Sequence, residues 1–225
     1  MYCHSRPAPA GRWRSSLKNF LAILALSTGL VSTAVPTFAD TLRLDSDSGQ
    51  SVGGEVVYPY SFNIDGASKL TALMCLNFNR KITIGETWNV TIAGVPLDNS
   101  QSSIDYRADA WIYSQLGSYS NADVQYAVWD IFDPQDVNGH TGFDATAQSL
   151  ASTGLSMATN QSLINSGFFS KFSLYVPTSD QTGWTRGTPQ EFIGTAQTPE
   201  PSSLFLMGTG LIGAAGVLRR RLARA

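Results

Sequence analysis

Hydrophobic and polar residues alternate in several short segments in the middle of the 225-residue chain. A repeat of two residues is typical of a β-strand with one buried face, and these segments are also rich in β-branched and aromatic residues. Turn-forming residues separate them. The predicted strands are residues 55–62, 70–78, 82–84, 87–92 and 171–176, and residues 191–194 are a further candidate.

Two segments instead repeat apolar residues at the spacing of an α-helix. These are residues 104–116 and residues 121–132, the second with Asp123 in its first turn. Residues 144–150 are a candidate third helix, whereas the Ser/Thr/Asn-rich residues 152–166 are typical of a loop. The expected fold class is therefore α+β: a mainly antiparallel β-sandwich or barrel-like sheet of about six to eight strands, with two or three inserted helices.

The first 39 residues differ in composition from the middle of the chain. They contain four basic residues and no acidic one, and an apolar run covers residues 20–35. Thr37 and Ala39 then place small side chains three and one positions before Asp40. This order predicts a secretory signal peptide over residues 1–39, removed by signal peptidase between Ala39 and Asp40. A retained membrane anchor is the alternative, but the apolar run is short and interrupted.

The last 30 residues also stand apart. Residues 196–202 form a polar, proline-containing linker, and residues 203–225 contain a glycine-rich apolar run followed by a basic tail. The run is near the shortest length for a membrane-spanning helix, and the terminal arginines place its end on the cytoplasmic side. We therefore expect residues 203–225 to form a transmembrane helix with a basic tail, and residues 40–195 to form one β-rich extracytoplasmic domain.

The C-terminal segment also carries a specific motif. Pro199, Glu200 and Pro201 precede the apolar run, and an arginine cluster follows it, which consists of Arg219, Arg220 and Arg221 with Arg224 nearby. In this order the parts resemble the PEP-CTERM sorting signal of Gram-negative bacteria, over residues 198–225. The resemblance implies an exosortase as processing partner and a link to exopolysaccharide or biofilm. It implies an exported protein, anchored in the membrane and then placed at the cell surface or in the extracellular matrix.

Charge and cysteine content narrow the function of the middle domain. Residues 40–198 contain 16 acidic and 7 basic residues, a formal charge of −9. Nucleic-acid binding requires basic surfaces, so we expect no nucleic-acid partner. Cys3 lies in the signal peptide, so the mature chain retains Cys75 alone and has no internal disulfide.

The middle domain contains few residues of the types that common catalytic sites use. His140 is the one histidine after the signal peptide, and no phosphate-binding glycine loop is present. Asp133 and Asp136 could give oxygen ligands to calcium, but the spacing of the twelve-residue calcium loop is missing, so a solvated helix end is the simpler interpretation. We predict no catalytic residue, no metal site and no cofactor.

One candidate pair of functional residues remains, Cys75 and Gln125. Cys75 lies in a predicted apolar strand and Gln125 in the first part of a predicted helix. The pair resembles bacterial thioester domains, in which a strand cysteine is joined to the glutamine of a Thr-Gln-x-x-apolar-Trp motif. Gln125, Val128 and Trp129 match that motif, while Val124 replaces its threonine. The resemblance implies a thioester between Cys75 and Gln125.

A thioester survives only where water is kept away, so we expect an apolar pocket formed by Trp129, Trp111 and Phe78. The expected function is non-enzymatic: adhesion, or covalent capture of a surface amine or hydroxyl. One alternative is a carbohydrate-active enzyme of the exopolysaccharide matrix. Another is an inert structural β-module, in which Cys75 is a small buried hydrophobic residue and Gln125 a polar residue near a helix start.

The signal peptide gives a direct prediction. N-terminal sequencing of the exported protein should begin at Asp40, because the small residues at Thr37 and Ala39 define the cleavage site. A sequence beginning at Met1 would show that the apolar run is retained as an anchor.

Overall fold

Six antiparallel strands close into a barrel in the computed structural model, which describes residues 40–179, 181, 187–196, 208–213, 215, 219 and 222. The order around the barrel is β1-β4-β5-β8-β7-β6, and β6 pairs with β1 to close it. The strands are β1 (Asp40–Ser46), β4 (Tyr60–Ile64), β5 (Thr71–Cys75), β6 (Thr87–Gly94), β7 (Phe172–Pro177) and β8 (Phe192–Thr195). A separate two-stranded ribbon joins β2 (Ser51–Val52) to β3 (Glu55–Val56). The predicted α+β class is confirmed, with a barrel rather than a sandwich.

Alternating side chains fill the barrel. In β1, Leu42 and Leu44 are buried while Arg43 between them is exposed. The rings of Phe62 and Phe192 lie 4.6 Å apart between centroids, and Trp88 packs edge-on to Phe62 at 5.8 Å. These aromatic rings occupy the interior, so the barrel is a packed core, as expected for a barrel of few strands.

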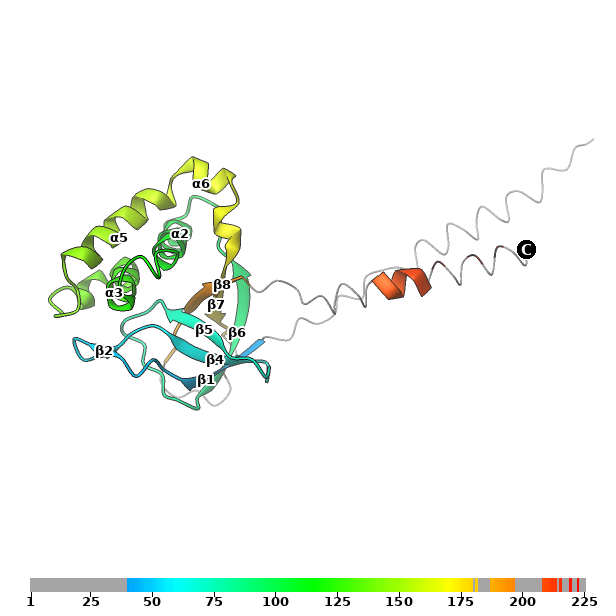
Figure 1. Cartoon of the computed structure of the whole chain (residues 1–225), viewed down its shortest axis with the longest axis horizontal. Helices are drawn as coiled ribbons and strands as arrows, with labels where there is room; N and C mark the ends of the chain where they lie inside the picture. The colour runs from blue at the N-terminus through cyan, green and yellow to red at the C-terminus, as the bar shows by residue number, and fades with distance from the viewer. Residues whose placement is uncertain are drawn as a thin grey trace, which may run out of the picture. The chain divides into compact units, whose positions relative to one another are not determined.

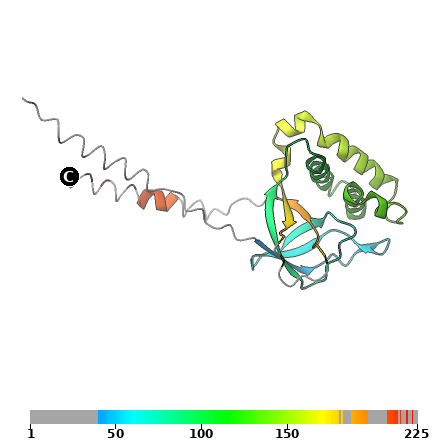
Figure 2. The same ribbon diagram turned by 180° about the vertical axis from the view of Figure 1, so that it is seen from behind.

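The helices lie between β6 and β7 in the sequence and cover one side of the barrel (Figures 1 and 2). They are α2 (Gln101–Tyr113), α3 (Asn121–Phe132), α4 (Pro134–Val137), α5 (Ala145–Ala158), α6 (Gln161–Asn165) and the 3-10 turn η1 (Phe168–Lys171). Ser100, Ser120 and Asp144 cap the three long helices by accepting backbone N–H groups of the first turn. The predicted helices at residues 104–116 and 121–132 correspond to α2 and α3, and the candidate at residues 144–150 is the first half of α5. The insertion extends beyond residue 150 and holds more helices than the two or three expected.

The prediction of a loop over residues 152–166 is wrong, because α5 continues to Ala158 and α6 follows. The buried face of α5 consists largely of alanine and glycine, which carry little hydrophobic signal in a sequence pattern. A Cβ atom on Gly154 would lie 2.7 Å from the Ile112 side chain. Small residues thus let α5 approach α2 closely, and packing forms the helix despite modest local propensity.

The prediction of a strand over residues 82–84 is also wrong. Gly85 donates its backbone N–H to the Leu44 carbonyl at 2.7 Å, and Glu86 bonds back to Thr83 at 3.0 Å, so this segment is a turn that enters β6. Leu44 of β1 also donates its backbone N–H to the Glu86 carbonyl at 3.1 Å, so pairing with β1 begins at residues 85–86 rather than at residues 82–84. Ile84 is left 54% exposed as a result.

A buried arginine ties the helical insertion together. Arg107 is 1% exposed, and its Nε donates to the Ala158 carbonyl at the end of α5 at 2.7 Å. Its Nη1 donates to the carbonyls of Pro96 and Asp98 before α2, at 3.1 and 2.8 Å. Carbonyl oxygens with no partner in their own helix or strand are thereby satisfied inside the protein.

The described part of the tail is helical at residues 208–213. Among the residues that the structure describes, no helix has the length and apolar character needed to cross a membrane. The predicted signal peptide, the Pro199–Pro201 motif and much of the predicted helix over residues 203–225 lie outside the described residues.

A buried carboxyl group on α2 gives a stability prediction. Asp109 is fully buried, and neither of its carboxylate oxygens has a hydrogen-bond partner among the described residues. Burial, with the nearby charges of Asp105 and Glu191, raises the pKa of the Asp109 carboxyl well above its usual range. The folded protein therefore holds a proton that the unfolded chain releases.

The free energy of unfolding should consequently fall as pH rises from the unfolded pKa of Asp109 toward its folded pKa, by up to about 1.4 kcal/mol per pH unit. Asp109→Asn should remove this slope, as measured by urea denaturation between pH 4 and pH 8. Asp136→Asn, at an exposed position on α4 whose charge does not contribute to the raised pKa of Asp109, is the control and should keep the slope. An unchanged slope in Asp109→Asn would contradict the account.

Candidate functional site

The chain leaves the barrel at the end of β5, and side chains from α3 pair with its backbone there. Gln125 donates its Nε2 to the Cys75 carbonyl at 2.7 Å. Asp133, at the end of α3, accepts the Phe78 backbone N–H on Oδ2 at 2.7 Å. Buried backbone groups require partners, so these contacts hold α3 against residues 75–78.

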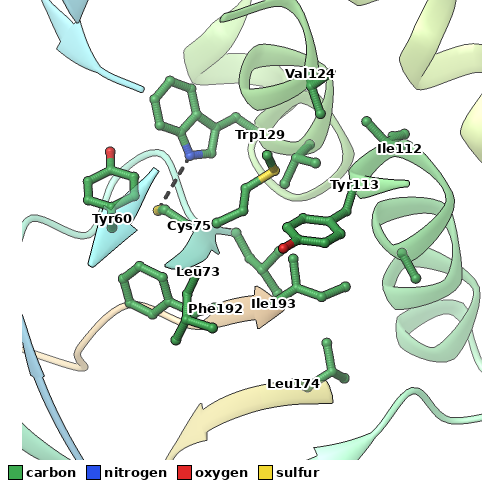
Figure 3. Close-up of a cluster of buried hydrophobic side chains, with 14 of the residues drawn as sticks. Tyr60, Leu73, Cys75, Ile112, Tyr113, Val124, Trp129, Leu174, Phe192 and Ile193 are labelled. Atoms are coloured by element: carbon green, nitrogen blue, oxygen red, sulfur yellow. Dashed lines mark hydrogen bonds between the residues drawn. The ribbon is translucent and has the colours of Figure 1, made fainter. Parts of the chain in front are cut away.

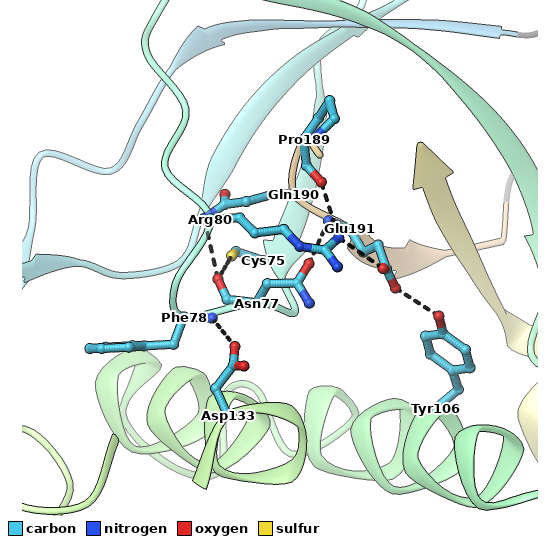
Figure 4. Close-up of polar contacts among 9 residues, drawn as sticks. All are labelled: Cys75, Asn77, Phe78, Arg80, Tyr106, Asp133, Pro189, Gln190 and Glu191. Atoms are coloured by element: carbon cyan, nitrogen blue, oxygen red, sulfur yellow. Dashed lines mark hydrogen bonds and ion pairs between the residues drawn. The ribbon is translucent and has the colours of Figure 1, made fainter. Parts of the chain in front are cut away.

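The chain segment before β8 pairs with the same residues from the other side (Figure 4). Leu76 donates its backbone N–H to the Glu191 carbonyl, and Asn77 accepts the Glu191 N–H on Oδ1, both at 2.9 Å. Gln190 donates its Nε2 to the Asn77 carbonyl at 3.2 Å. Residues 75–78 are thus held between α3 and residues 190–191.

The Cys75 thiol lies inside this arrangement and is fully buried. Its Sγ donates to the Asn77 carbonyl at 3.1 Å, and Trp129 donates its Nε1 to Sγ at 3.5 Å (Figure 3). Burial raises the pKa of the Cys75 thiol to about 12, which outweighs the opposing hydrogen bonds from Trp129, Asn77 and Gln190. The free thiol is therefore protonated at neutral pH.

Gln125 lies one helical turn into α3 and is fully buried. While its Nε2 bonds to Cys75, its Oε1 has no hydrogen-bond partner among the described residues. A buried amide oxygen without a partner costs about 1–3 kcal/mol, so this group is unusual in a native interior. The structure places the Gln125 carboxamide against the backbone carbonyl of Cys75.

Two of the three residues predicted to shield this pair lie beside it. Trp129 is 3% exposed and contacts Sγ, and Phe78 packs edge-on to Trp129 with ring centroids 5.1 Å apart. Phe78 also packs against His140 at 4.8 Å. Trp111 lies partly buried on α2, and across the described ranges no hydrogen bond or ring contact joins it to Cys75, Gln125 or Trp129.

Sequence reasoning missed Asn77 and Gln190, which complete the surroundings of the thiol. Both are polar yet 7% exposed. They come from segments more than one hundred residues apart in the chain, and neither belongs to a recognisable motif. In the sequence, the one indication of their role is that Asn77 follows the apolar segment of β5 and Gln190 precedes that of β8.

The acidic residues considered for calcium have other partners. Asp133 accepts the Phe78 N–H, and Asp136 accepts the side-chain amide of Asn79. Within the described ranges, no group of three or more histidine, cysteine, aspartate and glutamate side chains is arranged to hold a metal ion.

Comparison with known proteins identifies the tail. A model of the PEP-CTERM protein-sorting motif matches residues 197–221. This motif suggests an exported protein that an exosortase processes and that is associated with the membrane before processing. No curated protein and no solved structure matches the chain. The resemblance of the central domain to thioester domains gains no support from these comparisons, so it depends on the geometry around Cys75.

The contact between Asp133 and Phe78 gives a prediction about how the site is held. Asp133→Ala should lower the free energy of unfolding by about 1–3 kcal/mol, because it leaves the partly buried Phe78 N–H without a partner. Asp136→Ala is the matched control: its contact to Asn79 is exposed, so its effect should stay within about 0.5 kcal/mol. Urea denaturation of the two variants measures both values. Equal effects would show that the Asp133 contact does not anchor the site.

Proposed function

We propose that this protein is an exported component of the cell envelope or extracellular matrix, delivered by its PEP-CTERM tail, whose barrel domain captures a ligand covalently through a thioester between Cys75 and Gln125. The observation that supports the proposal is the 2.7 Å hydrogen bond from Gln125 Nε2 to the Cys75 carbonyl. It holds the glutamine carboxamide against the single cysteine of the domain.

The reaction balances without any cofactor. The Cys75 sulfur attacks the Gln125 carboxamide carbon, the carbon–nitrogen bond breaks, and the thiol proton leaves with the nitrogen as ammonia. The thioester is then an electrophile. An external amine or hydroxyl that attacks it forms an amide or ester to residue 125 and returns the proton to sulfur.

Burial of the site suits a bond of this kind. Cys75 and Gln125 are fully buried, and Trp129 and Phe78 shield them on one side. Exclusion of water slows hydrolysis of the thioester. The high pKa of the Cys75 thiol implies that little thiolate is present at neutral pH, so the bond should form slowly after folding.

A carbohydrate-active enzyme is the competing proposal, and it would require two converging carboxylates. The candidates beside this site are Asp47 and Glu55. Asp47 accepts the Gly49 backbone N–H at 2.8 Å, and Glu55 lies 3.9 Å from the Lys81 ammonium. Both carboxylates are engaged in local contacts, so we favour a non-enzymatic function.

The intact mass of the purified mature protein tests the proposal. Wild-type protein should be lighter than the sum of its residues by one ammonia, and both Cys75→Ala and Gln125→Ala should lose this deficit. Gln148→Ala, which changes an exposed glutamine on α5, is the matched control and should keep it. Incubation with methylamine should add the mass of the amine and make Cys75 available to thiol reagents in denaturant.

A wild-type protein of full mass, with a thiol that reacts once the chain is unfolded, would contradict the thioester. The barrel would then be a structural module with a buried cysteine.

A further inference from the structure

A pocket of about 210 Å³ opens next to the Cys75 site. Tyr60, Phe78 and Trp129 supply its aromatic lining, and Gln190 supplies a buried amide. Ile84 stands at its edge, where it is 54% exposed. The pocket is therefore open to ligands of small cross-section.

Two lining residues connect the pocket to the thiol. Trp129 donates its Nε1 to Cys75 Sγ at 3.5 Å. Gln190 donates its Nε2 to the Asn77 carbonyl at 3.2 Å, and the thiol donates to the same carbonyl at 3.1 Å (Figure 4). Trp129 and Gln190 thus line the pocket and also contact the thiol or its hydrogen-bond partner.

Gln190 has an unused acceptor. Its side chain is more than nine-tenths buried, and its Oε1 has no hydrogen-bond partner in the part of the chain that the structure describes. Native proteins rarely leave a buried amide oxygen unpaired. An N–H group of a molecule in the pocket would satisfy this oxygen.

Most of the charged side chains that line the pocket are paired with side chains of opposite charge. Arg80 forms an ion pair with Glu191 at 3.0 Å, and Lys81 lies 3.9 Å from Glu55. Asp47 is the remaining charged lining residue, and it bonds to a backbone N–H. The pocket therefore holds no uncompensated positive charge that would repel an amine.

We propose that this pocket is the route by which an amine ligand reaches the thioester, and that Gln190 Oε1 positions the amine by accepting one of its N–H groups. The inference rests on the proposed function of Cys75 and Gln125. The amine nitrogen attacks the Gln125 carbonyl carbon, the carbon–sulfur bond breaks as the amide forms, and the proton passes to the Cys75 sulfur. Gln190 is a positioning residue, since it forms no bond in this step.

A matched pair of variants tests the role of Gln190. Gln190→Met removes both the amide donor and the acceptor, whereas Gln190→Glu keeps an acceptor oxygen at this position. In the full chain, the rate of methylamine addition is followed by intact mass. Gln190→Met should keep the ammonia deficit but react about tenfold more slowly, as expected for one lost hydrogen bond, and Gln190→Glu should react at close to the wild-type rate.

The edge of the pocket offers a second test that does not depend on Gln190. Ile84→Trp should slow addition of benzylamine far more than addition of methylamine, because it narrows the entrance. Leu97→Trp, at a position that is 53% exposed and outside the lining, should change neither rate.

The outcomes separate the two proposals. A deficit in every variant with unchanged rates in Gln190→Met and Ile84→Trp would overturn the pocket and leave the thioester. A wild-type protein without the deficit would overturn both. If Gln190→Met does not fold, the benzylamine-to-methylamine ratio of Ile84→Trp decides, and an unchanged ratio overturns the pocket as the route.

Discussion

The need to pair buried backbone groups at the end of β5 organises this domain. Residues 75–78 leave the barrel into a region covered by helices, where water cannot satisfy their N–H and C=O groups. Gln125 and Asp133 from α3 supply partners on one side, and Gln190 and Glu191 supply them on the other. The helical insertion, the barrel and the segment before β8 therefore meet around one short stretch of chain.

The same constraint explains why a reactive arrangement arises from structural contacts. Gln125 is held against Cys75 because the Cys75 carbonyl needs a donor, and this contact brings the carboxamide to the same residue that carries the thiol. One oxygen of Gln125 and one of Gln190 remain without partners among the described residues. The contacts that pair the backbone thus leave these two buried amide oxygens in the region of the thiol. A thioester at Gln125, or a ligand bound to Gln190, would change their surroundings.

Much of this architecture was predictable from the sequence. Alternating residues indicated most barrel strands, and the helical spacing of residues 121–132 gave the bounds of α3. The second half of α5 escaped prediction because its buried face is built from alanine and glycine, whose fit against Ile112 depends on the distance between helices. Gln190 escaped because its role depends on the Asn77 carbonyl, a contact between distant segments that no local pattern encodes.

The distance between Cys75 Sγ and Gln125 Cδ in a crystal structure of the mature protein decides whether the thioester exists. A thioester requires continuous electron density between the two atoms at covalent bonding distance, with the amide nitrogen gone. Separate atoms at van der Waals distance, with the Gln125 amide still bonded to the Cys75 carbonyl, would contradict it.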